Sequence, residues 1–403
     1  MASYLLRKTI RRLPGVVIKA VPKPRPEVTE GFQTRSQTGK ICKEMGYQSC
    51  LIVTDQTLYS LAYHETIVKS LEENGIKASV FHDIASEPTV GIVEAGKAAA
   101  LQCGADCVIA LGGGSVLDAT KMIVSALRLR RRKVKSLLHK FLYVPRKSLP
   151  MISIPSTAGT GAEITVGAVI TKSNKGAKGS TVVFGLNIVH VILDSELTLK
   201  APRGVTAACG IDALSHGLEG VVASVKVPDA DIRKSLECVK LVLEHLPVVL
   251  KTPDCEASRL AMARAALYGG NAINEQLAGY VHAFAHSIGA LYHIPHGNAI
   301  ALSLLPVMRF QKEKCLNKLA KQAVYCGLAD SADDPKTAAD KLMDALEALI
   351  AACDFPDKGA FIRREDYPLL IKRITNDSIN YSAPVVLRKK DIIRVLNEIN
   401  GKE

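Results

Sequence analysis

The run CVIALGGGSVLDATKMIVSA, residues 107–126, decides the fold class of the chain. Its first five residues are all apolar, which is typical of a strand that is buried on both faces. Three glycines and a serine follow at 112–115, and apolar residues at helical spacing then predict a helix over 116–126. A strand, a glycine-rich turn and a helix in this order predict one unit of a parallel α/β sheet.

The same alternation continues on both sides of this run. Short apolar strands separated by helices predict a parallel sheet that is covered by helices on both faces. The other expected strands are 50–54, 78–82, 151–154 and 189–193, and the other expected helices are 63–74 and 93–104.

The pattern changes after about Pro202, where apolar residues recur at helical spacing almost to the end. We therefore expect an α/β domain at 27–202, an all-helical domain at 203–403 and a short extension at 1–26. The clearest helices in the second domain are predicted at 232–246, 257–273, 315–325 and 337–353.

The formal net charge of +13 is concentrated in two stretches. Residues 1–26 are basic and contain no acid, and a second basic cluster spans 128–140. Neither stretch has the interleaved aromatic residues of a single-strand binder or the spacing of a zinc finger. We therefore expect no nucleic-acid partner.

The extension at 1–26 has two interpretations. Its basic charge and scattered apolar residues are compatible with a transit peptide or with weak contact with an anionic membrane surface. The simpler interpretation, which we favour slightly, is a solvated extension that ends in the proline-rich stretch at 22–26.

Cysteine usage points to a reducing compartment. The chain has ten cysteines but no CxxC pair, and no apolar run is long enough to span a bilayer. We expect ten reduced thiols and a cytoplasmic location.

Two glycine-rich loops follow predicted strands. The first is 112–115, and the second, PSTAGTGAE at 155–163, adds the hydroxyls of Ser156, Thr157 and Thr160. Ligands bind at the carboxyl ends of parallel strands, and a helix N-terminus offers free N–H groups to an anion such as a phosphate. The spacing is not GxGxxG, so each loop alone is weak evidence. Asp55, after the first strand, is placed to bind an adenosine ribose or simply to cap a helix.

Four of the ten histidines fall between residues 281 and 297. His282 and His286 are four residues apart on a predicted helix and share a face, as do Asp212 and His216 on an earlier helix. Two such pairs facing each other would form a mixed nitrogen and oxygen site for a divalent metal.

Together these stretches resemble the iron-containing (group III) alcohol dehydrogenases, a family that includes lactaldehyde reductase, propanediol dehydrogenases and butanol dehydrogenases. The resemblance covers roughly residues 46–397, and its departures, at Ser156, Ala162, Ser195 and Cys209, are mild. The motifs that match in order are GGGS at 112–115 with Asp118 and Lys121, STAGTGAE at 156–163, ILD at 192–194, GIDALSH at 210–216, HAFAH at 282–286 and IPHG at 294–297.

The resemblance implies a dehydroquinate synthase-like architecture, with a dinucleotide-binding first domain and a second domain that binds metal and substrate. It implies four metal ligands, Asp212, His216, His282 and His296. Fe(II) is the expected ion, Zn(II) the alternative. His293 matches no ligand position. The implied cofactor is NAD, with NADP as the alternative, and the matching positions are Asp55, Gly113, Gly114, Ser115, Asp118, Ser156, Thr157, Thr165 and Lys178.

The activity implied is that of an alcohol dehydrogenase or aldehyde reductase acting on a small alcohol or aldehyde, in a homo-oligomer, expected as a homodimer. The metal would act as a Lewis acid and the nicotinamide would exchange hydride with the substrate. His286 is the expected proton relay, or else a structural histidine beside the ligands. The alternatives are a glycerol dehydrogenase, dehydroquinate synthase-like or hydroxyacid–oxoacid transhydrogenase activity on the same fold, and a non-catalytic binding protein.

Overall fold

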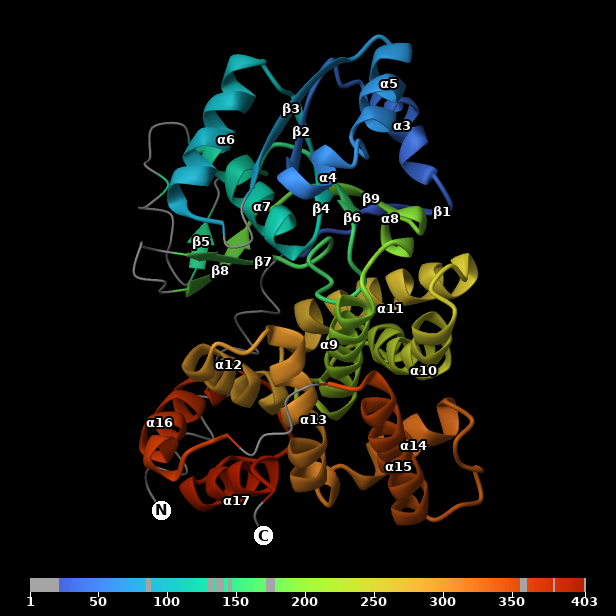
Figure 1. Cartoon of the computed structure of the whole chain (residues 1–403), viewed down its shortest axis with the longest axis vertical. Helices are drawn as coiled ribbons and strands as arrows, with labels where there is room; N and C mark the ends of the chain where they lie inside the picture. Colours follow the sequence, from blue (N-terminus) through green and yellow to red (C-terminus); the bar gives the residue numbers. More distant parts are fainter. Residues whose placement is uncertain are drawn as a thin grey trace. The chain divides into compact units, whose positions relative to one another are not determined.

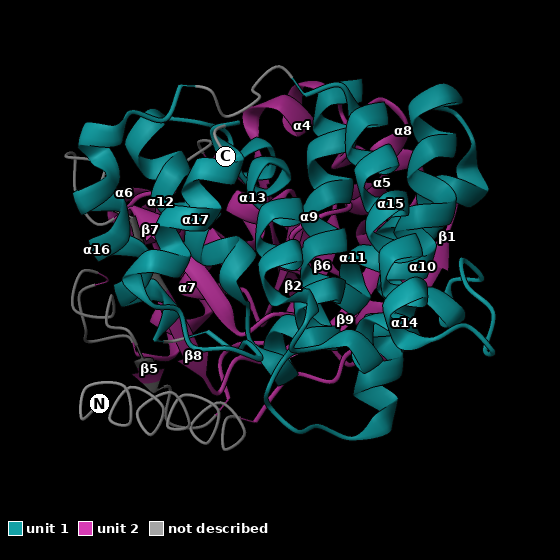
Figure 2. Cartoon of the chain, turned by 90° about the horizontal axis from the view of Figure 1, so that it is seen from below, with its two compact units in different colours: residues 1–20, 202–403 teal, residues 21–201 magenta. Residues whose placement is uncertain are grey.

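The computed structural model describes residues 22–84, 88–129, 134, 141–143, 147–171, 178–355, 361–379 and 381–401. The chain divides into two compact units, one of Val21–Ala201 and one that contains Pro202–Glu403 (Figure 2). Most of the extension at 1–26 and most of the basic cluster at 128–140 lie outside the described residues. No helix among the described residues is long and apolar enough to cross a membrane.

The first unit is built on a six-stranded, all-parallel sheet with the strand order β1-β9-β6-β4-β2-β3 (Figure 1). The predicted α/β fold class is therefore confirmed, and each predicted strand is present to within three residues at either end. The strands are β1 (Glu27–Gly31), β2 (Ser49–Asp55), β3 (Lys77–Ile84), β4 (Cys107–Gly112), β6 (Met151–Pro155) and β9 (Ile188–Asp194).

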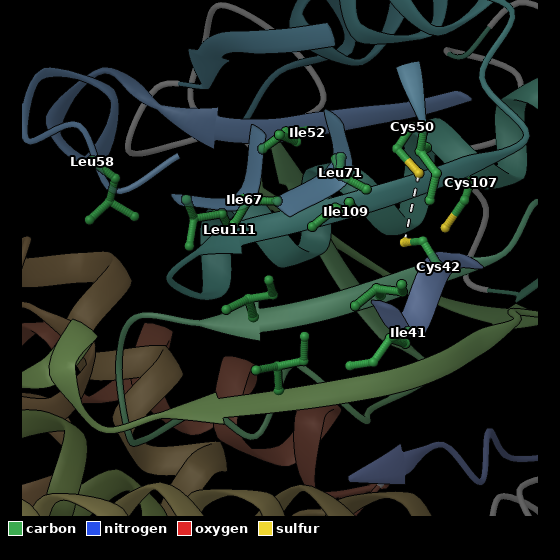
Figure 3. Packing of buried hydrophobic residues seen from close by; sticks show 14 of the residues in the cluster. Ile41, Cys42, Cys50, Ile52, Leu58, Ile67, Leu71, Cys107, Ile109 and Leu111 are labelled. Atoms are coloured by element: carbon green, nitrogen blue, oxygen red, sulfur yellow. Dashed lines mark hydrogen bonds between the residues drawn. The ribbon is translucent and has the colours of Figure 1, made fainter. Parts of the chain in front are cut away.

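Alternating strand residues build a hydrophobic cluster on one face of this sheet. Cys50 and Ile52 of β2 lie beside Ile109 and Leu111 of β4, and helices α3 and α5 add residues such as Leu71 (Figure 3). Burying one such side chain stabilises the fold by roughly 1.5–3 kcal/mol. The helices of this cluster and the short ones near it are η1 (Thr34–Gln37), α3 (Thr38–Glu44), α4 (Gln56–Ser60), α5 (Glu65–Glu73) and α8 (Glu196–Leu199).

Helices α6 (Val90–Gln102) and α7 (Gly114–Arg128) pack against each other, and both contact the sheet. The strand residues between those of the cluster, such as Leu51, Val108 and Ala110, are also buried. The sheet is therefore covered on both faces, as its apolar runs predict.

Four strands were not predicted from the sequence. β1 is an edge strand with the polar sequence EVTEG, so it has no apolar run to reveal it. The other three form a small second sheet with the order β5-β8-β7, in which no strand has an apolar run longer than three residues. They are β5 (Phe141–Tyr143), β7 (Gly167–Thr171) and β8 (Lys178–Phe184).

The described residues of the second unit form helices and connecting segments and no strand, as the fold class predicts. Helix α9 lies against α10, α11 and α13, and most of its residues are buried. The helices are α9 (Arg203–Val222), α10 (Asp229–Lys251), α11 (Glu256–Gln276), α12 (Tyr280–Tyr292), α13 (His296–Lys312), α14 (Leu316–Tyr325), α15 (Pro335–Cys353), η3 (Arg364–Asp366), α16 (Tyr367–Ser378) and α17 (Lys389–Ile399).

Candidate metal centre and cofactor loops

Helix α9 presents Asp212 and His216 on one buried face. The two residues are one helical turn apart, and their side chains are 5% and 7% exposed. Nε2 of His216 lies 3.6 Å from Oδ1 of Asp212. The central position of α9 in this unit places the pair among the other helices.

Helices α12 and α13 bring two more histidines to the same carboxylate. Nε2 of His282 lies 3.6 Å, and Nε2 of His296 3.4 Å, from Oδ1 of Asp212. His296 is the first residue of α13, which approaches α9 closely at this end. A Cβ atom on Gly297 would lie only 2.6 Å from the carbonyl oxygen of Ala208, so the approach requires glycine there. Three helices therefore converge on Asp212.

The converging atoms suit a divalent cation. Asp212, His282 and His296 each offer a ligand atom, and these atoms all lie within 4.8 Å of one another. Oδ1 of Asp212 and Nε2 of His282 are buried without a hydrogen-bond partner. Leaving such an atom unpaired costs about 1–3 kcal/mol, which a bound cation would offset. His216 lies outside this tight group but next to Asp212, so the structure brings all four expected ligands together around one carboxylate.

The environment of the centre favours the ligand forms of Asp212 and His216. Burial tends to raise the pKa of Asp212, but nearby His216 and His296 outweigh it and hold the pKa well below its usual range. Burial lowers the pKa of His216 to about 4, which keeps this ring neutral. An ionised carboxylate and a neutral imidazole are the forms that bind metal ions.

Glu219, a residue of α9 that the sequence did not predict as part of the site, accepts a hydrogen bond from His282. Oε2 of Glu219 lies 2.6 Å from Nδ1 of His282, and Oε1 accepts from the His282 backbone N–H at 3.2 Å. Burial lowers the pKa of His282, but Glu219 and Asp212 outweigh burial and raise it to about 10. The spacing Asp212, His216, Glu219 along one face of α9 could have indicated this residue.

His286 lies one turn beyond His282 on α12, and its side chain is exposed. Its ring stacks on His296 with the centroids 5.1 Å apart, and its Nδ1 lies 3.0 Å from the hydroxyl of Tyr381. Desolvation, followed by repulsion from His296 and His282, lowers the pKa of His286. Because the exposed ring keeps much of its hydration, repulsion from the neighbouring imidazoles is the main cause of this shift.

His293 takes no part in this group. It is the exposed C-terminal cap of α12, in the left-handed conformation with φ 56°.

Asp55 ends β2 and caps α4. Its Oδ1 accepts a hydrogen bond from the backbone N–H of Leu58 at 2.9 Å, which is the helix-capping role considered above. Its other oxygen accepts no hydrogen bond from the described part of the chain. The carboxylate therefore keeps an acceptor at the carboxyl end of the sheet, where dinucleotides bind in such folds.

The two glycine-rich loops lie side by side at the ends of β4 and β6. Gly113 caps α7, Gly114 and Ser115 form its first turn, and the N–H of Ser156 donates to the carbonyl of Gly112 at 3.0 Å. Thr157 follows in the same loop and is half-buried. The N-terminus of α7 thus lies next to two hydroxyl side chains, an arrangement suited to phosphate.

Asp118 and Thr165 contact a buried lysine rather than each other. Nζ of Lys121 lies 2.9 Å from Asp118, 3.0 Å from Thr165 and 2.7 Å from the carbonyl of Gly167. This network ties α7 to the segment between the second loop and the start of β7. Lys178 pairs with Thr171 in the small sheet, and its side chain lies outside the described residues.

Glu163, at the end of the second loop, is 1% exposed, and its Oε1 has no hydrogen-bond partner. Burial raises its pKa from 4.5 to about 7, against the smaller effects of its own backbone N–H and of Lys121. The native carboxyl therefore holds a proton that the unfolded chain has already released. As a result the free energy of unfolding falls as the pH rises from about 4.5 to about 7.

Glu163→Gln should remove this titration. We expect the free energy of unfolding of the wild type, minus that of the variant, to fall by about 2 kcal/mol between pH ~5 and pH ~8. Urea denaturation of both proteins across this range measures the difference. A difference that does not change with pH would show that the carboxyl ionises normally.

Comparison with known families matches the chain in two parts. The family described as iron-containing alcohol dehydrogenase matches residues 25–195, and the C-terminal family of Fe-containing alcohol dehydrogenases matches residues 206–400.

Individual proteins agree with this match. The chain is 30% identical over 364 residues to the NAD-dependent methanol dehydrogenase of Bacillus methanolicus, covering 89% of this chain and 94% of that enzyme. It is 29% identical over 367 residues to the bifunctional aldehyde-alcohol dehydrogenase of Escherichia coli strain K12, covering 83% of this chain but only 40% of that longer protein. The solved structure of sulfoacetaldehyde reductase from Bifidobacterium kashiwanohense in complex with NAD+ has a TM-score of 0.86 and 25% identity, covering 95% of this chain and 99% of that one.

Proposed function

The chain belongs to the iron-containing alcohol dehydrogenase family, and we propose that it is a metal-dependent enzyme that interconverts small alcohols and aldehydes with NAD. The observation that carries this proposal is the convergence of three histidines on buried Asp212, with two potential ligand atoms left unpaired. In this proposal the α/β domain at 27–202 binds the dinucleotide, and the helical domain at 203–403 binds metal and substrate.

Asp212, His216, His282 and His296 would hold one divalent ion, with Fe(II) preferred to Zn(II) because of the family. When bound, the ion supplies a Lewis acid for the substrate oxygen, and the nicotinamide supplies or accepts the hydride. The four residues contribute by holding their donor atoms in place before the substrate arrives.

His286 is the proposed proton relay. It is exposed, lies beside His296, and contacts the hydroxyl of Tyr381 through Nδ1. The neighbouring imidazoles favour its neutral form, which can take a proton from a substrate hydroxyl and pass it to solvent.

The cofactor is proposed to bind along the carboxyl ends of β2, β4 and β6. Gly113, Gly114 and Ser115 form the turn at the N-terminus of α7 that would receive the pyrophosphate, and Ser156 and Thr157 offer hydroxyls. Asp118 and Thr165 act from within the Lys121 network, which fixes the segment after the second loop against α7. Asp55 and Lys178 are the other two residues that we propose to contact the cofactor.

Asp55 should set the choice between NAD and NADP. A carboxylate accepts hydrogen bonds from the 2′-hydroxyl of the adenosine ribose and repels a 2′-phosphate. We expect the wild type to prefer NAD(H), and Asp55→Gly to shift the ratio of kcat/KM values toward NADP(H) by about tenfold or more, since loss of one charged contact is worth about 1.5–3 kcal/mol. Initial rates with both cofactors measure this shift. A wild type that clearly prefers NADPH would show that Asp55 does not face the ribose.

Turnover tests the function itself. Reduction of a panel of small aldehydes by NADH, without any added hydroxyacid, is the expected result and separates this enzyme from a transhydrogenase. Activity confined to glycerol, or to paired hydroxyacid and oxoacid substrates, would replace the proposal with one of the related activities.

The cellular setting is also a proposal. All ten cysteines are free thiols, which supports a reducing, cytoplasmic compartment. A homodimer and a weak membrane-surface contact of residues 1–26 remain predictions. Light scattering would test the first, and vesicle binding with and without residues 1–26 would test the second.

A further inference from the structure

The carboxylate of Glu219 is fully engaged by one histidine and the turn before it. Glu219 is 1% exposed and reaches from α9 to the start of α12. Oε2 accepts from Nδ1 of His282 at 2.6 Å, and Oε1 accepts from the backbone N–H of the same residue at 3.2 Å. A Cβ atom on Gly279 would lie 2.9 Å from Oε1, so only glycine lets the backbone pass this close to the carboxylate.

These two contacts fix the ring of His282 in one orientation. Oε2 accepts a hydrogen bond from Nδ1 of the ring. The other ring nitrogen, Nε2, is therefore the one that remains to coordinate a metal ion. Nε2 points toward Asp212, 3.6 Å from its Oδ1, and has no hydrogen-bond partner. The backbone contact holds the main chain of His282 at the same time, so both ends of the residue are tied to one carboxylate.

We propose that Glu219 is a positioning residue of the metal centre, which selects Nε2 of His282 as the ligand atom and aims it at Asp212. This inference rests on the proposed metal function. It adds a residue that touches neither metal nor substrate but acts through a ligand.

Glutamine cannot replace this carboxylate, although it has almost the same shape. Both oxygens of Glu219 accept hydrogen bonds, whereas an amide has one oxygen and one NH₂ group, which only donates. If the amide oxygen faces the backbone N–H, its NH₂ group faces Nδ1 of His282 and favours the tautomer with the hydrogen on Nε2. If the amide is turned round, its oxygen accepts from Nδ1, but its NH₂ group then faces the backbone N–H of His282, and two donors oppose each other. Either outcome disturbs the ligand.

The experiment compares Glu219→Gln with Glu27→Gln as a matched control. Glu27 lies 3.9 Å from Nδ1 of His190 in the other unit, so the control makes the same change beside a histidine far from this centre in the sequence. Metal-free full-length proteins are titrated with Co(II), whose visible absorption reports ligand geometry, in competition with a chelator. Thermal unfolding of the metal-free proteins is measured in parallel.

We expect Glu219→Gln to bind Co(II) about 10–100-fold more weakly than the wild type, with an altered visible spectrum, because loss of an outer hydrogen-bond partner of a ligand has this typical effect. Glu27→Gln should bind like the wild type. Equal affinity and spectrum in Glu219→Gln and the wild type would overturn the inference, even if the variant unfolds at a lower temperature. If Glu219→Gln does not fold, the test uses Glu219→Asp, which keeps both acceptor oxygens on a side chain that is one methylene shorter. This variant should bind Co(II) more weakly than the wild type. Unchanged Co(II) binding by Glu219→Asp would overturn the inference. A wild type that binds no Co(II) would instead refute the proposed metal function.

Discussion

A chain with alanine at Asp212 or His282 is expected to lose both its metal and its turnover. Each change removes a donor from a group whose atoms lie within 4.8 Å of one another. A Lewis acid stabilises the developing charge on the substrate oxygen by several kcal/mol, so its loss should lower kcat by ~10³-fold or more. Metal analysis of the purified variants, together with NADH-dependent aldehyde reduction, measures both effects.

His293 provides the matched control for this prediction. It is a histidine of the same segment, but it caps α12 at the surface in the left-handed conformation, which asparagine also adopts readily. His293→Asn should keep its metal and its activity. The prediction is wrong if His282→Ala turns over substrate normally with no bound metal.

A chain with alanine at His286 is expected to keep its metal but to lose much of its turnover. His286 lies on the same face of α12 as His282, yet the group of ligand atoms closes without it. Removing a general acid–base group typically lowers the rate by ~10²–10⁴-fold. The expected signature is therefore near-normal metal content, a reduced kcat and an altered pH profile.

Tyr381→Phe refines this second prediction. It removes the hydroxyl that lies 3.0 Å from Nδ1 of His286 but leaves the ring in place, so a smaller fall in kcat is expected. Metal loss in His286→Ala equal to that in His282→Ala would make His286 a ligand or an essential support. Full activity in His286→Ala would leave it with a structural role only.

The sequence predicted the buried parts of the fold well because burial imposes a strict pattern. Strands such as β4 are apolar at every position, since both faces of the sheet are covered. Strand β1 was missed because an edge strand needs no apolar run, and its pairing with β9 joins segments far apart in the sequence. The small sheet was missed because the apolar runs of its strands are no longer than three residues.

In the candidate site, too, local sequence patterns could be predicted, whereas contacts between distant segments could not. Helical spacing and the resemblance to a family were enough to propose the four ligands, because pairs one turn apart must share a helix face. Helical spacing places Glu219 on the same face of α9 as Asp212 and His216, but its partner His282 comes from another helix, and only the packing of α9 against α12 shows this contact. The contacts of Lys121 with Asp118 and Thr165 also depend on packing that no local pattern encodes.

The most direct test of the metal-dependent function combines metal analysis with an activity assay on the wild type. The purified protein should contain one divalent ion per chain and reduce a small aldehyde with NADH. Chelation should abolish this activity, and added Fe(II) or Zn(II) should restore it, because Asp212 and its three histidines form the site for the ion. Undiminished aldehyde reduction by a protein shown to be free of metal would contradict the account.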